Sequence, residues 1–326
     1  MPIPEPLSPD EVLVRVIATG MTGSELEVDD WTPSRAFMTD GLPVALGHEF
    51  VGRIETGPQR GRRVLVRPSL ACGRCIACVQ GREADCAHRS SIVLLRDGTF
   101  DPWVRVPLRN CVPIPATLSD ELVALAEPMS IAMQALRVAG PVRGARVLVM
   151  GPGLVGQGVA VLARRAGAAQ VVVSGFGEAA RFGVLRRMGF AALVNVAEGD
   201  LATLAATFTG GAEFDLIIEA TGVPETIHDA LPLLRREGVV VVTGIHARPL
   251  QLDLTRLVRR QHQVRGSSRP AQAEWAQTLM LLGELAGVIE PMLSRVVPCA
   301  RAGQGRTPAY GSLAGKVMPR RRFCND

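Results

Sequence analysis

Four cysteines in one short stretch are the residues whose spacing points most directly to chemistry. The stretch runs Cys72-Gly-Arg-Cys75-Ile-Ala-Cys78, and Cys86 follows after residues 79–85. Four thiolates in one loop can wrap a zinc ion tetrahedrally with no open coordination position, which is typical of a structural site. Reduced cysteines without metal are the alternative, whereas disulfides are disfavoured in a reducing compartment. We therefore predict a structural zinc held by these four cysteines.

A glycine pattern forms a second candidate site. An apolar run over residues 147–150 meets the pattern Gly-x-Gly-x-x-Gly, and a helix is predicted over 154–166. A strand, a tight turn and a helix take this form where a pyrophosphate binds, because the free N–H groups and the dipole at the helix start favour negative charge. Without that context, the pattern would equally fit glycines that let a helix pack closely. We predict nucleotide contacts from Gly151, Gly153, Leu154, Val155 and Gly156.

The end of the next predicted strand, 170–174, bears on the choice of cofactor. Gly175 stands where proteins that use NAD carry an acidic residue for the ribose 2′-hydroxyl. Its absence removes repulsion against a 2′-phosphate, and Arg181 could donate charge-assisted hydrogen bonds to that group. An ordinary solvated helix residue is the alternative for Arg181. We predict NADP or NAD as the cofactor, with a lean towards NADP, and further contacts from Ser174, Gly175, Arg181, Thr221 and Gly244.

Strands and helices alternate throughout this part of the chain. Helices are predicted over 179–188, 201–207, 224–234 and 254–261, and strands over 193–196, 215–220, 239–243 and 263–266. Continuous apolar strands between helices favour a parallel sheet that is covered on both faces. Residues 130–266 are therefore predicted to form a doubly wound, dinucleotide-binding α/β domain.

Further polar residues with suitable chemistry precede that domain. His48 and Glu49 follow an apolar stretch, and Glu127 stands at the start of a predicted helix. Taken alone, a His-Glu pair more often lies on a surface or in a satisfied core than at a metal, and an acidic residue at a helix start complements the dipole. The polar turn at 20–27 contains Thr22, Ser24 and Glu27.

The composition limits the class of protein. Two domains are expected for 326 residues, and 47% hydrophobic and 21% charged residues are ordinary for globular chains. The formal net charge is +5, but the basic residues are scattered arginines with Lys316 as the single lysine, so nucleic acid is not an expected partner. No apolar run reaches membrane-spanning length, and no basic segment precedes an apolar core at the N-terminus. We expect a soluble, cytoplasmic protein with no membrane partner.

In their order along nearly the whole chain, these segments resemble the zinc-type medium-chain dehydrogenase/reductase family. The matching segments are the turn at 20–26, GHEFVG at 47–52, the cysteine lobe at 72–86, AEPMSIAMQAL at 126–136, the glycine pattern at 151–156, IEATGVPETI at 218–227 and LAGKV at 313–317. Glu127 and the GSELE turn are most similar to the sorbitol, threonine and glucose dehydrogenases. The resemblance implies an α/β protein whose Rossmann domain, 130–266, is inserted into a GroES-like, partly open β-barrel of residues 1–129 and 267–326.

The resemblance also implies a reaction and a site. Such enzymes transfer hydride between NAD(P) and a small secondary alcohol or ketone, here of a sugar, polyol or cyclitol-like metabolite, with a catalytic zinc as Lewis acid. Carried onto this chain, the zinc ligands come from position 22, His48 and Glu127, with Glu49 as an exchanging ligand or the partner of one. Ser24 starts the proton relay, and Glu27 passes the proton on or holds a polyol hydroxyl. A homodimer or homotetramer is implied in the same way.

Position 22 and the segment 300–309 depart from the family pattern, the latter because glycine and proline interrupt a helix. The family has cysteine where this chain has Thr22, whose neutral hydroxyl is a poor zinc ligand. His48, Glu49 and Glu127 could still hold a catalytic zinc together with water. The alternatives are a zinc-independent reductase of an activated alkene or carbonyl, and a non-catalytic dinucleotide-binding protein with the structural zinc alone. Two zinc ions per chain would favour the dehydrogenase, and one would favour the alternatives.

Overall fold

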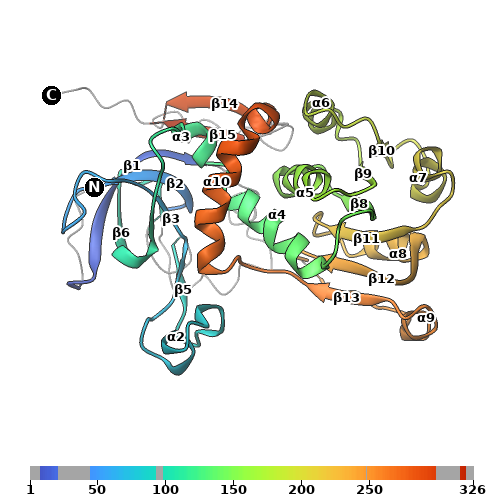
Figure 1. The fold of residues 1–326 in the computed structure, drawn as a ribbon, viewed down its shortest axis with the longest axis horizontal. Coiled ribbons are helices and arrows are strands. Elements are labelled where there is room, and N and C mark those ends of the chain that lie inside the picture. The colour runs from blue at the N-terminus through green and yellow to red at the C-terminus, as the bar shows by residue number, and fades with distance from the viewer. Residues whose placement is uncertain (1–7, 21–44, 93–97, 247, 299–315, 321–326) are drawn as a thin grey trace. The chain divides into compact units, whose positions relative to one another are not determined.

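The chain divides into two compact units. A computed structural model describes residues 8–20, 45–92, 98–246, 248–298 and 316–320 (Figure 1). The first unit combines Met1–Glu127, Ala271–Gly311 and Lys316–Asp326, and the second consists of Pro128–Pro270 with Ser312–Gly315. Within the described ranges, no helix has both the length and the apolarity that crossing a membrane requires.

A curled seven-stranded sheet is the framework of the first unit. Its strands are β1 (Glu11–Gly20), β2 (Glu49–Ile54), β3 (Arg63–Val66), β6 (Trp103–Pro107), β7 (Cys111–Pro113), β14 (Leu293–Pro298) and β15 (Lys316–Arg320). They lie in the order β14-β15-β1-β2-β3-β7, and β6 also pairs with β1. The pairing of β1 with β2 shifts register between Val16 and Ala18, and such an irregularity bends a strand. The curled sheet confirms the predicted barrel-type fold.

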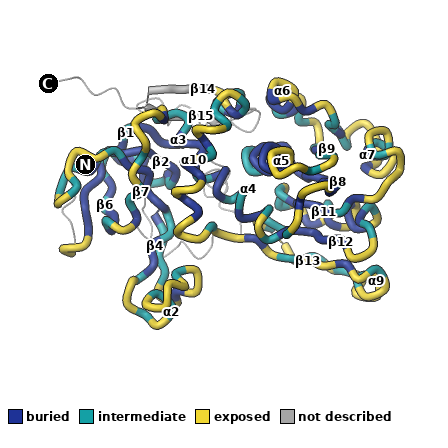
Figure 2. The backbone as a smooth tube through the Cα atoms, in the orientation of Figure 1, coloured by how far each residue is buried: buried dark blue, intermediate teal, exposed yellow. Residues whose placement is uncertain are grey.

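Alternation along these strands places one face of the sheet in the core. Val14, Phe50 and Ile54 are fully buried in one cluster, and Figure 2 shows β1 and β2 mostly as buried chain. Burying a side chain of this size contributes about 1.5–3 kcal/mol. The long helix α10 (Gln272–Ile289) contacts the short helix α3 (Asp120–Val123) in the same unit. Trp275 of α10 is buried.

A six-stranded sheet forms the centre of the second unit. Its strands are β8 (Arg146–Met150), β9 (Gln170–Gly175), β10 (Leu193–Asn195), β11 (Phe214–Glu219), β12 (Leu234–Val242) and β13 (Gln263–Gly266). They lie in the order β10-β9-β8-β11-β12-β13, and every neighbouring pair is parallel. The strand order therefore reverses between β8 and β11, as in a doubly wound dinucleotide fold. The predicted α/β class with a Rossmann sheet is confirmed.

The helices of this part of the chain are α4 (Ala126–Ala139), α5 (Leu154–Arg165), α6 (Ala179–Arg187), α7 (Leu201–Thr209), α8 (Glu225–Ala230) and α9 (Leu254–Arg260). Helix α5 packs on β8 and β9, α7 on β9 and β10, α8 on β11, and α9 on β12 (Figure 1). Local signals set their ends: the Asp200 carboxylate caps α7 by accepting from the Thr203 N–H at 2.9 Å, and Gly210 ends it in the left-handed region.

One predicted helix, 224–234, is wrong at its end. Helix α8 stops at Ala230, a 3₁₀ turn covers Leu231–Leu233, and β12 begins at Leu234, five residues before the predicted strand start at Val239. Pro232 explains the early stop, because proline has no N–H to donate and disfavours a continuing α-helix. Leu234 is fully buried and pairs with Phe214, so burial extends the strand backwards.

Candidate functional site

The four cysteines of the predicted zinc lobe come together. Their sulfurs all lie within 4.8 Å of one another, with Cys72 and Cys78 3.9 Å apart and Cys75 and Cys78 3.5 Å apart. Zinc–sulfur distances of about 2.3 Å place the corners of a tetrahedron about 3.8 Å apart, so the cluster fits a zinc ion. Short elements hold it, namely α2 (Ile76–Val79), β4 (Ser69–Leu70), β5 (Ser90–Ser91) and a 3₁₀ turn at Glu83–Asp85.

Backbone N–H groups point at the sulfurs, as expected where thiolate charge must be stabilised. The N–H of Cys72 donates to the Cys86 sulfur at 3.3 Å, and that of Cys75 donates to the Cys72 sulfur at 3.4 Å. Backbone hydrogen bonds from Arg74 and Cys75 lower the pKa of Cys72 to about 6, whereas desolvation raises the pKa of Cys78 to about 12. A backbone hydrogen bond from Cys78 lowers the pKa of Cys75 too, so the lobe favours thiolate formation before any metal binds, and a cation would supply the charge for the remaining thiols.

Two arginines tie the lobe to its unit. Arg109 donates to the carbonyl of Ala71 at 2.7 Å, just before the first cysteine. The buried Arg67 donates to the Arg109 carbonyl at 2.9 Å and pairs with Glu83 at 3.2 Å. Because Glu83 starts the turn that leads to Cys86, these contacts fix both ends of the cysteine segment.

A second group of ligand atoms gathers His48, Glu49 and Glu127. One nitrogen or oxygen from each residue lies within 4.8 Å of the others. Glu49 opens β2 and is 3% exposed, His48 precedes it, and Glu127 lies in the first turn of α4. An imidazole and two carboxylates are donors that zinc accepts, and three protein ligands leave a position open for water or substrate. Two segments far apart in sequence thus meet at one candidate metal centre.

The backbone beneath His48 and Glu49 is held in place by its neighbours. Gly47 has φ +97°, and a Cβ there would lie 2.3 Å from the Thr99 hydroxyl oxygen, so only glycine fits. The N–H of Thr99 donates to the Gly47 carbonyl at 2.9 Å, and the Thr19 hydroxyl donates to the Glu49 carbonyl at 3.1 Å. The hydroxyls of Thr19 and Thr99 also bond each other. The predicted partners Thr22, Ser24 and Glu27, and the segment 300–309, lie outside the described residues.

The glycine pattern has the geometry that nucleotide binding needs. Gly151 follows β8 with φ +101°, and a Cβ on Gly156 would lie 1.8 Å from the Gly151 carbonyl oxygen, so turn and helix pack without room for a side chain. A Cβ on Gly153, by contrast, would meet nothing within 4 Å. Gly153 caps α5, whose first residues are Leu154 and Val155, so open space faces the N–H groups of the helix start.

The packing around Gly175 explains why this position is a glycine. A Cβ on this last residue of β9 would lie 2.7 Å from the ring of Pro152, inside the glycine pattern. The missing acidic side chain therefore follows from Pro152 as well as from cofactor preference. Ser174 is buried and its carbonyl accepts from the Gly151 N–H at 2.9 Å. Arg181 pairs with Glu178 at 2.6 Å, which competes with any phosphate for its guanidinium.

Residues to which the sequence analysis assigned no role also lie where the parallel strands end. Phe176, Val223 and Ile245 follow β9, β11 and β12 and are 74%, 46% and 61% exposed. Glu219 ends β11 fully buried and contacts His246 at 3.0 Å. A charged residue closing an otherwise apolar strand was the available signal for Glu219, because ligands bind outside the carboxyl ends of parallel strands.

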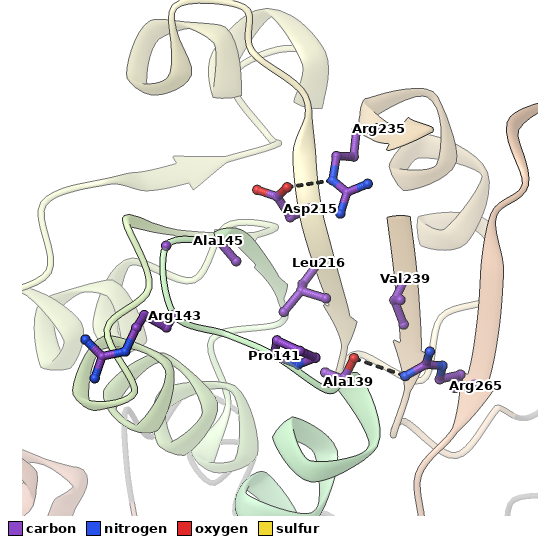
Figure 3. A pocket seen from close by; sticks show the side chains of 10 residues that line it. Ala139, Pro141, Arg143, Ala145, Asp215, Leu216, Arg235, Val239 and Arg265 are labelled. Carbon is purple, nitrogen blue, oxygen red and sulfur yellow. Dashed lines mark hydrogen bonds and ion pairs between the residues drawn. The ribbon is translucent and has the colours of Figure 1, made fainter. Parts of the chain in front are cut away.

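A cavity of about 310 Å³ lies at the opposite end of the parallel strands from the glycine pattern (Figure 3). Its lining includes Asp215 and Arg235, which form an ion pair at 2.6 Å, and Arg265, which donates to the Ala139 carbonyl at 3.1 Å. Asp215 and Arg235 are the second residues of β11 and β12, away from the glycine pattern, and both Arg235 and Arg265 already bind the protein. The cavity is therefore not the nucleotide site.

Comparison with known proteins identifies the class to which this fold and these sites belong. Residues 8–116 match the alcohol dehydrogenase GroES-like domain, and residues 155–284 match the zinc-binding dehydrogenase family. The chain belongs to the zinc-type medium-chain dehydrogenase/reductase family. It is an oxidoreductase of the alcohol dehydrogenase kind that uses NAD or NADP, and the cysteine lobe fits the zinc for which the family is named.

Individual relatives align along most of the chain. L-galactonate-5-dehydrogenase of Escherichia coli (strain K12) is 31% identical over 306 residues, covering 92% of this chain and 87% of the relative. L-threonine 3-dehydrogenase of Saccharopolyspora erythraea is 28% identical over 324 residues, covering 98% and 93%. The crystal structure of a predicted zinc-binding dehydrogenase from Sinorhizobium meliloti 1021, bound to NADP, is 28% identical with a TM-score of 0.83, covering 98% and 94%.

Proposed function

We propose that this dehydrogenase interconverts a secondary alcohol and a ketone on a sugar, sugar acid, polyol or cyclitol-like metabolite, with a zinc ion at His48, Glu49 and Glu127. The convergence of these three residues carries the proposal. The relatives named for galactonate and threonine support a small, polar secondary alcohol. When bound there, zinc would polarise the substrate oxygen as a Lewis acid.

In this proposal, side chains of the protein hold the metal and move the proton. His48 and Glu127 would hold the zinc, and Glu49 would be an exchanging ligand or the hydrogen-bond partner of a ligand. Ser24 hydrogen-bonds the substrate oxygen and takes its proton, and Glu27 passes that proton on or holds a second hydroxyl. Thr22 would contribute at most a neutral oxygen, which is a poor zinc ligand, so these residues would hold the metal weakly.

The dinucleotide is proposed to bind at the strand ends of the second unit. Gly151, Gly153 and Gly156, with the N–H groups of Leu154 and Val155, receive the pyrophosphate. Thr221 and Gly244 lie in the loops after β11 and β12, and we assign them to the nicotinamide half. The relative bound to NADP and the absence of an acidic residue at Gly175 support NADP, provided that Arg181 leaves Glu178 for the 2′-phosphate.

Counting zinc and measuring turnover on the same samples tests the catalytic site. The wild-type chain should carry two zinc ions after gentle purification and lose one on dialysis, together with its activity. His48→Ala and Glu127→Ala should retain one zinc and lose at least about 100-fold in turnover, because a Lewis acid supplies several kcal/mol of the barrier reduction. Thr22→Cys should slow the loss of zinc on dialysis, because a thiolate is the stronger ligand.

The alternatives give different results in the same experiment. A zinc-independent reductase of the same fold would be fully active with one zinc and indifferent to His48→Ala and Glu127→Ala. A non-catalytic protein would bind dinucleotide and would not convert any substrate.

We further propose that the protein is a homodimer or homotetramer, which analytical ultracentrifugation would test. The cytoplasmic location stays a prediction.

A further inference from the structure

A buried carboxylate joins the two loops that follow β11 and β12. Glu219, the last residue of β11, has no exposed surface. Its Oε1 accepts three hydrogen bonds, from the Thr221 N–H at 2.6 Å, the Thr221 hydroxyl at 2.6 Å and the Gly222 N–H at 2.8 Å. Its Oε2 lies 3.0 Å from Nε2 of His246, in the other loop. A buried charge persists only when paired in this way, so the carboxylate fixes both loops.

The two loops touch backbone to backbone around this carboxylate. A Cβ on Gly244 would lie 2.4 Å from the Gly222 nitrogen and 2.7 Å from the Glu219 carboxylate. Gly222 has φ +73°, and a Cβ there would lie 2.6 Å from the Ile245 carbonyl oxygen. The N–H of Gly244 also donates to the Glu219 carbonyl at 3.2 Å. Displacing the carboxylate would therefore move Thr221 and Gly244 together.

The place of this contact in the sheet links it to one half of the cofactor. The glycine pattern follows β8, and a doubly wound sheet binds a dinucleotide across the point where the strand order reverses, here between β8 and β11. The adenosine half then lies over β8, β9 and β10, and the nicotinamide half lies over β11, β12 and β13. Glu219 and His246 stand beneath the nicotinamide half.

We propose that Glu219 and His246 are positioning residues that clamp the loops at Thr221 and Gly244 into the shape that binds the nicotinamide half of the cofactor. This inference rests on the proposed dinucleotide site. His246 acts as the donor through Nε2–H, and the carboxylate accepts. Neither residue needs to touch the reacting atoms.

Variants of His246 test the clamp without removing the buried charge. His246→Leu deletes the donor at similar volume, His246→Gln keeps an N–H of similar reach, and His246→Asn is polar but too short. His228→Leu is the matched control, because His228 is an exposed histidine on α8 in the same unit. Circular dichroism checks folding, and His246→Asn replaces His246→Leu if the latter does not fold.

The experiment compares two sets of dissociation constants for each variant. One set is for the dinucleotides NADPH and NADH, and the other is for 2′,5′-ADP and 5′-ADP, which occupy only the adenosine half of the site. His246→Leu and His246→Asn should weaken the dinucleotides at least about tenfold, the loss expected for one hydrogen bond to a charged group, and change the ADP constants less than about twofold. His246→Gln should restore most of the affinity, and His228→Leu should match wild type.

Three results would overturn the inference. Equal weakening of dinucleotides and ADP ligands would mean a general structural role. Unchanged dinucleotide affinity in His246→Leu would mean that the loops need no clamp. A wild-type chain that binds ADP ligands and dinucleotides equally tightly would show that the nicotinamide half gains nothing from these loops. Wild-type protein that binds none of these ligands would instead refute the proposed dinucleotide site itself.

Discussion

The cysteine lobe makes a residue-level prediction about metal content. Cys75→Ser and Cys86→Ser should each lower zinc by about one ion per chain, because three thiolates and a neutral hydroxyl hold zinc poorly. Cys111→Ser is the control, because this thiol lies in β7 and burial raises its pKa to about 12, so it is not a ready ligand. Elemental analysis after gel filtration measures the result. Full zinc in both lobe variants would show that the lobe is not a metal site.

The contact between Gly175 and Pro152 predicts how a change of cofactor preference must be engineered. Gly175→Asp alone should lower the free energy of unfolding by about 1–3 kcal/mol, because the new side chain meets the Pro152 ring. With Pro152→Ala, which removes the two nearest ring atoms and leaves the Phe182 ring 3.2 Å from the new Cβ, the same aspartate should be better tolerated. It should then shift the ratio of NADH to NADPH affinity about tenfold towards NADH. Thermal melts and cofactor titrations of single and double variants check both parts, and a stable Gly175→Asp protein would contradict the first.

His262 makes the second unit sensitive to acid. Burial lowers the pKa of His262, and the charges of Arg260 and Arg256 lower it further. The folded state therefore resists protonation that the unfolded state accepts near its ordinary value of 6.5, so stability is lost as the pH falls from there through the lowered folded pKa. His262→Gln should reduce the drop in melting temperature between pH 7.5 and 5.5, and His228→Gln should leave it unchanged. Equal drops in all three proteins would exclude His262.

At this scale, residue spacing predicts groups that are close in the chain, whereas His48 and Glu127, which lie far apart in it, were grouped only through the family resemblance. Four cysteines within one loop have few arrangements other than a shared metal. Glu219 and His246, by contrast, meet only because β12 lies beside β11, and Gly175 has a packing cause only because Pro152 faces it. Residue spacing along the chain does not indicate such pairs, because the partners come from separate segments.

The turn between β8 and α5 separates structural glycines from functional ones. Gly156→Ala should destabilise the second unit and abolish dinucleotide binding, because its Cβ would overlap the Gly151 carbonyl. Gly153→Ala should leave the melting temperature nearly unchanged and still weaken dinucleotide binding, because its Cβ would enter the space expected for the pyrophosphate. Calorimetry and cofactor titration distinguish the two. Normal dinucleotide affinity in Gly153→Ala would argue against phosphate binding at this turn.

Among whole elements, those with continuous apolar runs were predictable. The runs that became β8, β9 and β11 are buried on both faces of a parallel sheet, which leaves a plain pattern in the sequence. The start of β12 was not predictable in that way, because Arg235 and Arg236 interrupt its apolar pattern before Val239. The predicted helix 224–234 is too long because it includes Pro232, which disfavours a continuing α-helix.

For the molecule as a whole, the two separate hydrophobic cores predict that each unit has its own free energy of unfolding. The first unit has its core around the curled sheet and the second around the parallel sheet. Zinc chelation should therefore speed amide hydrogen exchange in the first unit, and dinucleotide at 100 times its dissociation constant should stabilise the second by about 2.7 kcal/mol. Hydrogen exchange followed peptide by peptide measures both. Equal protection of both units by either ligand would show that they unfold as one.

The distribution of aromatic side chains has an optical consequence. All three tryptophans belong to the first unit, namely Trp31, Trp103 and Trp275. Among Phe, Trp and Tyr, the second unit contains only phenylalanines, so tryptophan fluorescence does not report its unfolding. An unfolding curve recorded by fluorescence would thus describe half of the protein. Phe176→Trp, at the 74% exposed position after β9, would give the second unit a tryptophan whose fluorescence reports its unfolding. The adenosine of a bound cofactor is expected to lie near this position and to quench that fluorescence.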